Sequence, residues 1–294
     1  MQPAGEPFVQ IQEASRSVLS QLFAAAPASL FHYTSGEGLL GILRSGHVRG
    51  SNYAFMNDRS EFVYGATLLR EVVEERSQNP RDDVDQDYYY AILRSQTPVI
   101  SELYLTCFCT KGDLLSQWRG YGSQNSRYCL RFAPDDFEAM HHASPLVPVI
   151  YDRPKQRELL NTVLDKHLDG LYAVSRPERP ALFKPMASCT YACCLAAFAL
   201  FKDDSFEEEH EWRSMLLVRP GDYEKQLEFS PTSGLMKPTL PLLQGHSNGK
   251  LPLLEVICGA SVFPEQAMRS AKLMLARYDY PPDRVSMSRV PLSS

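Results

Sequence analysis

Two short segments of the chain concentrate side chains that can bind or transform a small molecule. Residues 32–35 read His-Tyr-Thr-Ser, and residues 207–213 read Glu-Glu-Glu-His-Glu-Trp-Arg. In an extended segment Glu209, Glu211 and Arg213 project from one face. Two carboxylates beside an arginine can divide their roles, because the cation keeps one ionised while the other acts on a substrate. We therefore expect the candidate active site to join these two segments.

Each segment also has a purely structural interpretation. Thr34 and Glu37 have the spacing of a capping box, in which Thr34 caps a helix and His32 is a satisfied core histidine. Taken alone, the first segment fits this interpretation better. Glu207 and Glu208 are expected to be solvated charges before a strand, whereas for the Glu-x-Glu-x-Arg part the structural and functional interpretations carry equal weight. Only the combination of the two segments favours the functional interpretation over the structural one.

A third segment, residues 117–122, reads Gln-Trp-Arg-Gly-Tyr-Gly. Trp118 and Tyr121 are three residues apart and would share one face of a short helix, where their rings could stack on a ligand. The competing interpretation is an aromatic pair that anchors the helix in the core.

The seven cysteines predict neither a disulfide framework nor a metal site. Their number is odd, and they fall within expected strands and an expected helix rather than in loops. The chain has no Cys-x-x-Cys pair, which structural zinc sites usually use. Cys107 and Cys109 would share one face of a strand, whereas Cys193 and Cys194 are adjacent on a helix. We expect reduced, buried thiols and no metal ligands.

Composition places the chain among globular proteins. Of its 294 residues 44% are hydrophobic and 22% are charged, and the net charge is −5. Lysine and arginine are scattered, so no patch for binding nucleic acid is expected. The N-terminus lacks the pattern of a secretory signal, which favours the cytoplasm. The apolar stretch 185–201 is expected to be a buried core helix rather than a membrane span, so no membrane partner is expected.

The elements that would position these residues predict an α+β fold. Strands are expected at 30–33, 47–50, 103–110, 128–132, 146–151, 212–218, 253–257 and 284–289, and helices at 8–26, 35–44, 58–76, 84–96, 155–171, 185–201 and 264–277. No linker requires two domains, so residues 1–294 are expected to form one domain. It would have an N-terminal helix within 1–27, a core of 28–294, and a mixed, mainly antiparallel sheet surrounded by helices.

The order of the motifs resembles a bacterial family of unknown function, number twenty-nine seventy-one. The resemblance rests on His32-Tyr33-Thr34-Ser35, Asn57-Asp58-x-x-Glu61, Trp118-x-x-Tyr121, Glu209-x-Glu211-x-Arg213 and the closing strand Glu255-Val256-Ile257-Cys258-Gly259. It spans most of the chain, but membership of such a family implies no activity.

A weaker resemblance links the chain to the ADP-ribosyltransferase superfamily. It rests on the early histidine at a strand end, the mid-chain aromatic residues and the late glutamate at a strand start. The resemblance implies an NAD-consuming enzyme with a similar fold, in which His32 holds a ribose and Tyr33, Trp118 or Tyr121 stacks on a ring. Thr34 and Ser35 would complete the NAD site. The chain departs from that superfamily's pattern because Tyr33 follows the histidine and no Ser-Thr-Ser strand is visible.

The implied chemistry is cleavage of the nicotinamide–ribose bond and transfer of ADP-ribose to an unknown protein or nucleic-acid acceptor. This reaction develops oxocarbenium character, which a carboxylate stabilises. Glu211 would take that role and Glu209 would orient the acceptor. Arg213 would either bind the pyrophosphate or keep a glutamate ionised. A role in toxicity or phage defence would accord with this chemistry.

Two other functions use the same residues differently. In a metal-dependent phosphodiesterase or nuclease, magnesium would be held by acidic side chains, namely Asp203, Asp204, Glu209 and Glu211, with Asp58 and Glu61. In a non-catalytic sensor, the same cleft would bind a nucleotide without turnover. Activity that a chelator abolishes and that does not depend on NAD would identify the first, and binding without a product would identify the second.

Overall fold

The structure is a computed structural model. It describes residues 26–56, 60–94, 102–120, 126–141, 146–219, 221–232, 234–245 and 250–290. The helix expected at 8–26, the cap expected at Asp58 and the ring of Tyr121 lie outside these residues.

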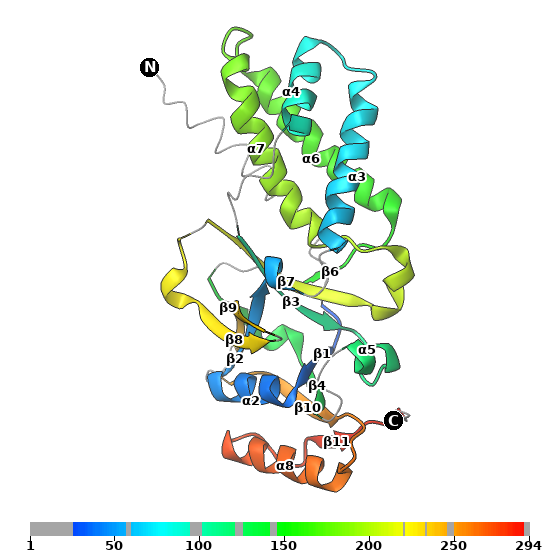
Figure 1. The fold of residues 1–294 in the computed structure, drawn as a ribbon, viewed down its shortest axis with the longest axis vertical. Helices are drawn as coiled ribbons and strands as arrows, with labels where there is room; N and C mark the ends of the chain where they lie inside the picture. Colours follow the sequence, from blue (N-terminus) through cyan, green and yellow to red (C-terminus); the bar gives the residue numbers. More distant parts are fainter. Residues whose placement is uncertain are drawn as a thin grey trace.

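Eleven strands form one sheet in this part of the chain (Figure 1). They are β1 (Leu30–Ser35), β2 (His47–Asn52), β3 (Glu102–Cys109), β4 (Arg127–Phe132), β5 (Phe137–Ala139), β6 (Val147–Pro148), β7 (Glu211–Val218), β8 (Glu228–Thr232), β9 (Leu235–Gly245), β10 (Leu253–Cys258) and β11 (Val285–Met287). The pair β10 and β11 is parallel, and the other strand pairs are antiparallel. The predicted α+β class with a mixed, mainly antiparallel sheet is therefore confirmed.

The helices lie between and beyond these strands. The α-helices are α2 (Gly36–Ser45), α3 (Ser60–Ser77), α4 (Asp83–Arg94), α5 (Leu115–Gly120), α6 (Arg153–Ala173), α7 (Arg179–Phe198) and α8 (Pro264–Arg277). Four short 3-10 helices are η1 (Tyr53–Phe55), η2 (Pro134–Asp136), η3 (Asp204–Glu209) and η4 (Glu224–Gln226).

Strand β3 lies between β1 and β2 in the strand order and also pairs with β7. Along one edge it pairs with β7 over its whole length, from Glu102 opposite Val218 to Cys109 opposite Glu211. On the other edge β1 meets it only at Cys109, and β2 meets it at Leu105 and Tyr104. The strands β1 and β2 therefore diverge, and the sheet opens between them beside residues 106–108.

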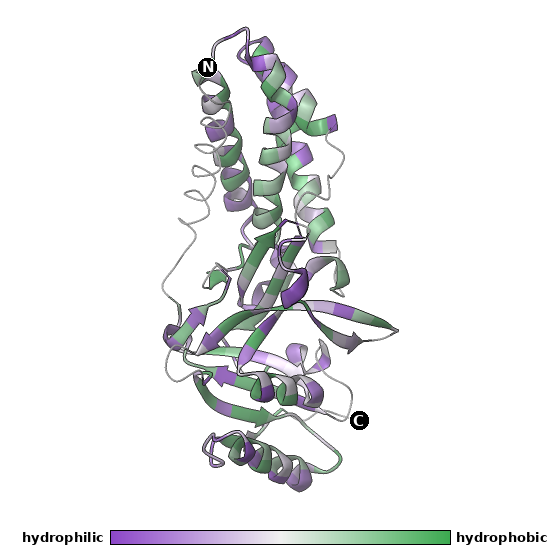
Figure 2. Cartoon of the chain, turned by 90° about the vertical axis from the view of Figure 1, so that its left-hand side faces the viewer, coloured by the Kyte–Doolittle hydropathy of each residue, from purple (hydrophilic) through white to green (hydrophobic). Residues whose placement is uncertain are grey.

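Two apolar cores cover the two faces of β3. Leu105 points into a core formed with α3, α4, α6 and α7, which stand as a bundle on one side of the sheet (Figure 1). Tyr104 points into a second core, formed with α2 and α8. Figure 2 shows apolar residues running along the helices of the bundle and continuing in the strands. This separation follows from the alternation of side chains along a strand.

Helix α7 is the core helix expected from the apolar stretch, but it begins earlier than expected. By length and composition it could cross a membrane. In the structure it packs against α3, α4 and α6, and Phe198 and Cys194 on it are fully buried. It starts at Arg179 and includes Pro185 within its length. The uncharged stretch begins only at Pro185, after Lys184, so it marks the apolar part of the helix and not its start.

Two local predictions near the candidate site were wrong. The cap of α2 is Ser35 rather than Thr34, since the Ser35 hydroxyl accepts a hydrogen bond from the Gly38 N–H at 3.1 Å. Glu209 does not lie on an extended strand with Glu211, because η3 ends at Glu209 and His210 adopts a left-handed conformation with φ of 43°. The strand begins only at Glu211, so the expected same-face argument fails for Glu209.

The contact between α3 and α7 gives a test of this packing. A Cβ atom on Gly65 would lie 2.7 Å from the side chain of Phe198. We expect Gly65→Ala to lower the melting temperature, because overpacking costs about 1–3 kcal/mol and exceeds the gain of about 0.5–1 kcal/mol from removing a helix glycine. Gly120→Ala is the matched control, since nothing lies within 4 Å of its Cβ position. Equal melting temperatures for the two variants, measured by circular dichroism, would contradict this packing.

Candidate functional site

The opening between β1 and β2 forms a cleft of about 460 Å³. This volume lies in the range of small-molecule sites. The first turn of α2 forms one wall, and β2 with the β8–β9 hairpin forms the other. The lining residues are His32, Thr34, Ser35, Glu37, Gly38, Ile42, Val48, Arg49, Ser51, Phe229, Ser230, Pro231, Lys237 and Thr239. Three of the four residues of the first segment singled out in the sequence, all but Tyr33, thus face one cleft.

His32 is fixed in the opening by the main chain of β3. Its Nδ1 lies 2.8 Å from the carbonyl oxygen of Cys107. A carbonyl can only accept, so Nδ1 carries the proton and donates. Burial lowers the pKa of His32, against the opposing effect of this hydrogen bond, so the neutral ring is favoured. In the neutral ring Nε2 is then a hydrogen-bond acceptor, suited to a ligand hydroxyl.

The first turn of α2 adds polar groups to the same cleft. The hydroxyl of Thr34 and the carboxylate of Glu37 line it, while the Ser35 hydroxyl caps the helix. A helix N-terminus carries partial positive charge and exposed N–H groups. Glu37 supplies an acceptor for hydroxyl or amino groups and opposes an anion next to it. We therefore expect hydroxyls of a ligand near Glu37 and its phosphates further away, towards the opposite wall.

Two cations line the opposite wall. Lys237 of β9 is half-buried, and burial lowers its pKa. Among the described residues no carboxylate lies within ion-pair distance of Lys237. Arg49 of β2 is paired with Glu228 of β8, which also contacts His47 at 3.2 Å. A half-buried ammonium without an acidic partner is stabilised by a bound anion, so Lys237 is the residue most suited to a phosphate group.

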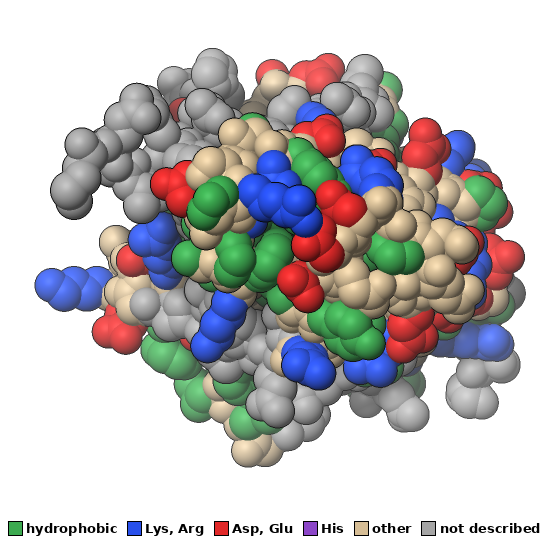
Figure 3. Space-filling model, turned by 90° about the horizontal axis from the view of Figure 1, so that it is seen from above, with side chains coloured by type: hydrophobic (Ala, Val, Ile, Leu, Met, Phe, Trp, Pro, Cys, Tyr) green, Lys and Arg blue, Asp and Glu red, His purple; other side chains and the backbone are tan. Residues whose placement is uncertain are grey.

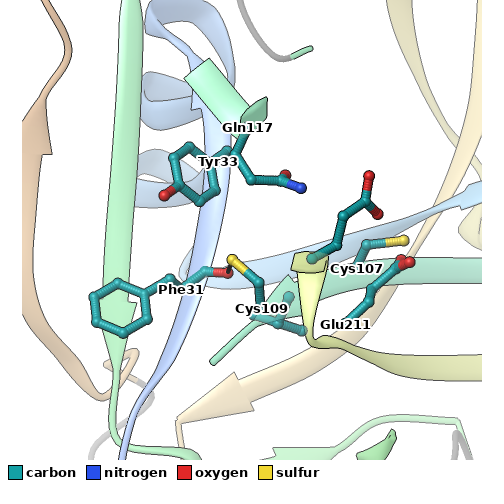
Figure 4. A pocket seen from close by; sticks show the side chains of 8 residues that line it. Phe31, Tyr33, Cys107, Cys109, Gln117 and Glu211 are labelled. Carbon is teal, nitrogen blue, oxygen red and sulfur yellow. Dashed lines mark hydrogen bonds between the residues drawn. The ribbon is translucent and has the colours of Figure 1, made fainter. Parts of the chain in front are cut away.

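A second, much smaller cavity lies on the other face of β3. Figure 4 shows Tyr33 and Gln117 on one side of it and Glu211, Cys107 and Cys109 on the other; Phe31, Phe108 and Glu209 complete its lining. Its volume of about 20 Å³ has room for about one water molecule. His32 and Tyr33 face opposite sides of β1, because successive residues on a strand alternate. Residues 32–35, which were expected to form one site, therefore line two different cavities.

The late acidic segment forms a buried network of five charges. Lys202 Nζ lies 2.5 Å from Glu209, 3.1 Å from Glu211 and 3.1 Å from Glu61 of α3. Arg213 donates to both oxygens of Glu211, at 2.8 and 2.9 Å, and to Glu61 at 2.8 Å. Its remaining nitrogen donates to the carbonyl of Ala199 at 2.7 Å. The network connects β7 to the helix bundle, and its two cations face three carboxylates.

The members of this network differ in access to solvent. The side chain of Glu209 is 23% exposed, whereas those of Glu211 and Arg213 are 7% and 2% exposed. The pKa of Glu211 is lowered to about 2, because Arg213 and Lys202 outweigh the effect of burial. Arg213 thus keeps a glutamate ionised, the second of its two expected roles. Glu209 is the glutamate best placed to meet a ligand.

The aromatic residues expected to stack on a ligand are in the core. Trp118 is fully buried, and its indole N–H donates to Asp113 at 2.8 Å. It packs edge-on against Tyr33, whose hydroxyl accepts from the Leu114 N–H at 2.8 Å. Neither ring presents a face to the cleft, so the anchoring interpretation of Trp118 accounts for its position. Tyr121 lies outside the described residues.

Several cleft residues were not found from the sequence. Arg49, Ser51, Lys237 and Thr239 carry the donors of the far wall. Each is an isolated polar residue in a strand, with no motif around it. They meet His32 only because β2 and β9 pair antiparallel, with Ser51 opposite Thr239. Long-range pairing of this kind leaves no local signal in the sequence.

Comparison with known proteins gives a match to one family over part of the chain and no function. Residues 117–214 match the model of a family described as "Protein of unknown function (DUF2971)", which is the family predicted from the motifs. The match runs from Gln117 to Ser214 and includes the Glu-x-Glu-x-Arg motif. No curated protein and no solved structure gives a significant match to the chain. The match therefore shows similarity to this family over residues 117–214.

The charge network predicts a specific loss of stability in acid. The pKa of Glu211 is about 2 in the folded protein and has an ordinary value of 4.5. Its contribution is therefore present above pH 4.5 and is lost as the pH falls towards 2. Over that range we expect the free energy of unfolding to fall by roughly 2–3 kcal/mol more in the wild type than in Glu211→Gln. Denaturant melts at several pH values measure this difference.

The matched control is Glu265→Gln, which removes an exposed carboxylate from α8. It should retain the full wild-type dependence on pH. The same slope in wild type and Glu211→Gln would show that Glu211 is not held ionised by its neighbours.

Proposed function

We propose that the protein is an NAD-dependent enzyme of the ADP-ribosyltransferase type, which acts in the cytoplasm and binds the adenosine ribose and the pyrophosphate of NAD in the cleft between β1 and β2. The observation that carries the proposal is that hydrogen-bond acceptors lie on one side of this cleft and cations on the other. His32 and Glu37 provide acceptors for hydroxyl groups on one side, and Lys237 and Arg49 provide cations on the other. A ligand that satisfies both walls carries sugar hydroxyls and phosphates together, as a nucleotide does.

The proposed reaction requires a ligand in this cleft to reach the glutamates, which lie on the other face of β3. Neighbouring strands are about 4.8 Å apart, so β1 and β7, which flank β3, are about 10 Å apart. This spacing is shorter than a dinucleotide. The nicotinamide ribose would extend past the start of β1 towards Glu209, the most accessible of the three carboxylates. Because the cavity there has room for about one water, the proposal requires it to widen when NAD binds.

The roles of the residues follow from their surroundings. His32 positions the adenosine ribose through Nε2, and Lys237 binds the pyrophosphate. Glu211 stays ionised between Arg213 and Lys202 and places negative charge near the reacting ribose. Glu209 orients the acceptor or stabilises positive charge on the ribose directly. The acceptor is a protein or nucleic acid, and a toxin or defence function accords with this activity. Figure 3 shows acidic and basic side chains interspersed on the end of the helix bundle, so that face offers no uniform basic surface for nucleic acid.

A second candidate is a nucleotide sensor without catalysis. The observation that favours it is that Glu211 is buried and fully bound within the charge network. Both oxygens of Glu211 accept hydrogen bonds from Arg213, and one also contacts Lys202. Loss of one partner from such a network would leave a buried charge unpaired whether or not a substrate is present, so the glutamates have a structural role of their own. In this case the cleft would bind NAD and release it unchanged.

The same network disfavours a magnesium-dependent hydrolase. Magnesium sites need carboxylate oxygens free to bind the ion. Here Lys202 and Arg213 already bind Glu61, Glu209 and Glu211. A metal would have to displace two cations from a buried site.

Binding measurements test the cleft. We expect His32→Ala to weaken NAD binding about tenfold, because one hydrogen bond is lost. We expect Lys237→Ala to weaken it roughly 10- to 100-fold, because its bond to the pyrophosphate is charge-assisted. Lys272→Ala, an exposed residue on α8, is the matched control and should bind as the wild type does. Isothermal titration calorimetry reports all four affinities, and unchanged binding in both cleft variants would exclude the cleft as the site.

Product analysis separates the enzyme from the sensor. Purified wild-type protein with NAD should release nicotinamide, and Glu209→Gln and Glu211→Gln should each reduce the rate at least tenfold, because transition-state charge is left unstabilised. Circular dichroism confirms that the variants are folded. NAD binding without nicotinamide release, with or without a cell extract as the source of acceptor, would contradict the transferase and support the sensor.

A further inference from the structure

A group of potential metal ligands lies inside the helix bundle, away from the cleft. His167 of α6 and Cys189 and Cys193 of α7 each offer a ligand atom, and these atoms lie within 4.8 Å of one another. Cys189 and Cys193 are one helical turn apart, so their side chains share a face of α7. His167 is fully buried, Cys189 is 7% exposed, and Cys193 lies nearer the surface. The group therefore has a buried interior and one side open to solvent.

The histidine is held by a chain of hydrogen bonds that fixes its proton. The Thr190 hydroxyl donates its single hydrogen to the carbonyl of Met186 at 2.9 Å. The same oxygen lies 2.5 Å from the Tyr88 hydroxyl and 2.7 Å from His167 Nδ1. Because its hydrogen is committed, Thr190 accepts from both, and His167 Nδ1 carries the proton. In that tautomer the lone pair is on Nε2, which would be the nitrogen that binds a metal.

This arrangement matches the outer shell of protein metal sites. A ligating histidine almost always donates its other N–H to a fixed acceptor, which orients the ring and raises its basicity. Thr190 provides that acceptor, and Tyr88, which is fully buried, holds Thr190 in place.

The ligand types and the burial select the metal. Two sulfur atoms and an imidazole are soft or borderline ligands, which favour zinc over magnesium or calcium. Two thiolates and a neutral histidine balance the charge of a divalent ion, whereas with Cu(I) the buried group would keep a negative charge. Ligand atoms in a tetrahedral zinc site lie about 3.5 Å apart, so the three side chains need to close by only about 1 Å.

We propose that His167, Cys189 and Cys193 bind one zinc ion, with a water molecule as the fourth ligand on the side of Cys193. Binding releases the two thiol protons to solvent, so no oxidant or reductant is needed. The ion would join α6 to α7 and stabilise the bundle that holds Glu61 in the charge network. The sequence did not reveal this group, because its cysteines are four residues apart on a helix and its histidine lies on another helix.

Cobalt substitution tests the proposal without any assay of activity. The full chain is reduced, stripped of metal with a chelator and titrated with Co²⁺. We expect thiolate-to-cobalt charge-transfer absorption and the visible bands of a tetrahedral ion to saturate at one equivalent. Addition of Zn²⁺ should remove them. Absence of these bands in the folded wild type, or saturation at a clearly different stoichiometry, would overturn the proposal.

Variants separate the ligands from their neighbours. Cys189→Ala and Cys193→Ala should each lose most of the charge-transfer absorption. Cys194→Ala is the matched control, since Cys194 is fully buried on the same helix but outside the group. Wild-type spectra from both ligand variants, or loss of binding in the control alone, would contradict the assignment. If a ligand variant fails to fold, the wild-type titration still decides the outcome.

Thr190, which orients His167, allows a second test through the zinc affinity. Thr190→Val removes the acceptor of His167 Nδ1 and keeps all three ligands, so zinc affinity should fall about 10- to 100-fold. Thr190→Ser restores the hydroxyl and should restore the affinity. Equal zinc affinities in wild type and Thr190→Val would show that the hydrogen bond does not orient a ligand.

Discussion

The hydrogen bond from His32 to the carbonyl of Cys107 is the interaction on which the proposed site depends. Strand β3 pairs with β7 on one edge, but on the other β1 and β2 diverge and leave part of that edge without a strand partner. A main-chain carbonyl in this position needs a donor. His32 supplies it, and the same bond leaves Nε2 as an acceptor at the mouth of the cleft. One contact therefore satisfies the sheet and sets the chemistry of the site.

Strand β3 also connects the cleft to the charge network on its other face. The carbonyl of Cys107 bonds to His32, and Cys107 and Cys109 pair with Arg213 and Glu211 of β7. The network reaches the bundle through Glu61 of α3 and Lys202, which follows α7. Glu61 and Lys202 thus bring the bundle into contact with the glutamates. The buried charges fix the relative positions of these parts because unpaired charges there would be costly.

The sequence predicted the parts of the fold whose signals are local. Periodicity and alternation predicted the helices and strands, and the motifs indicated the family whose model matches residues 117–214. The sequence did not predict that His32 and Tyr33 serve different faces of the sheet, that Glu209 precedes the strand in a 3-10 turn, or that Lys237 faces His32. These features depend on where β1 and β2 diverge and on strand pairs distant in the chain. Local propensity carries no information about either.

The most direct test of the account is a crystal structure of the protein with a non-hydrolysable NAD analogue. We expect a ribose hydroxyl within hydrogen-bonding distance of His32 Nε2, with Nδ1 still donating to Cys107. We also expect the pyrophosphate beside Lys237 and the nicotinamide side of the analogue directed past β1 towards Glu209. An analogue bound outside the cleft, or His32 turned so that Nε2 faces the carbonyl, would contradict the account.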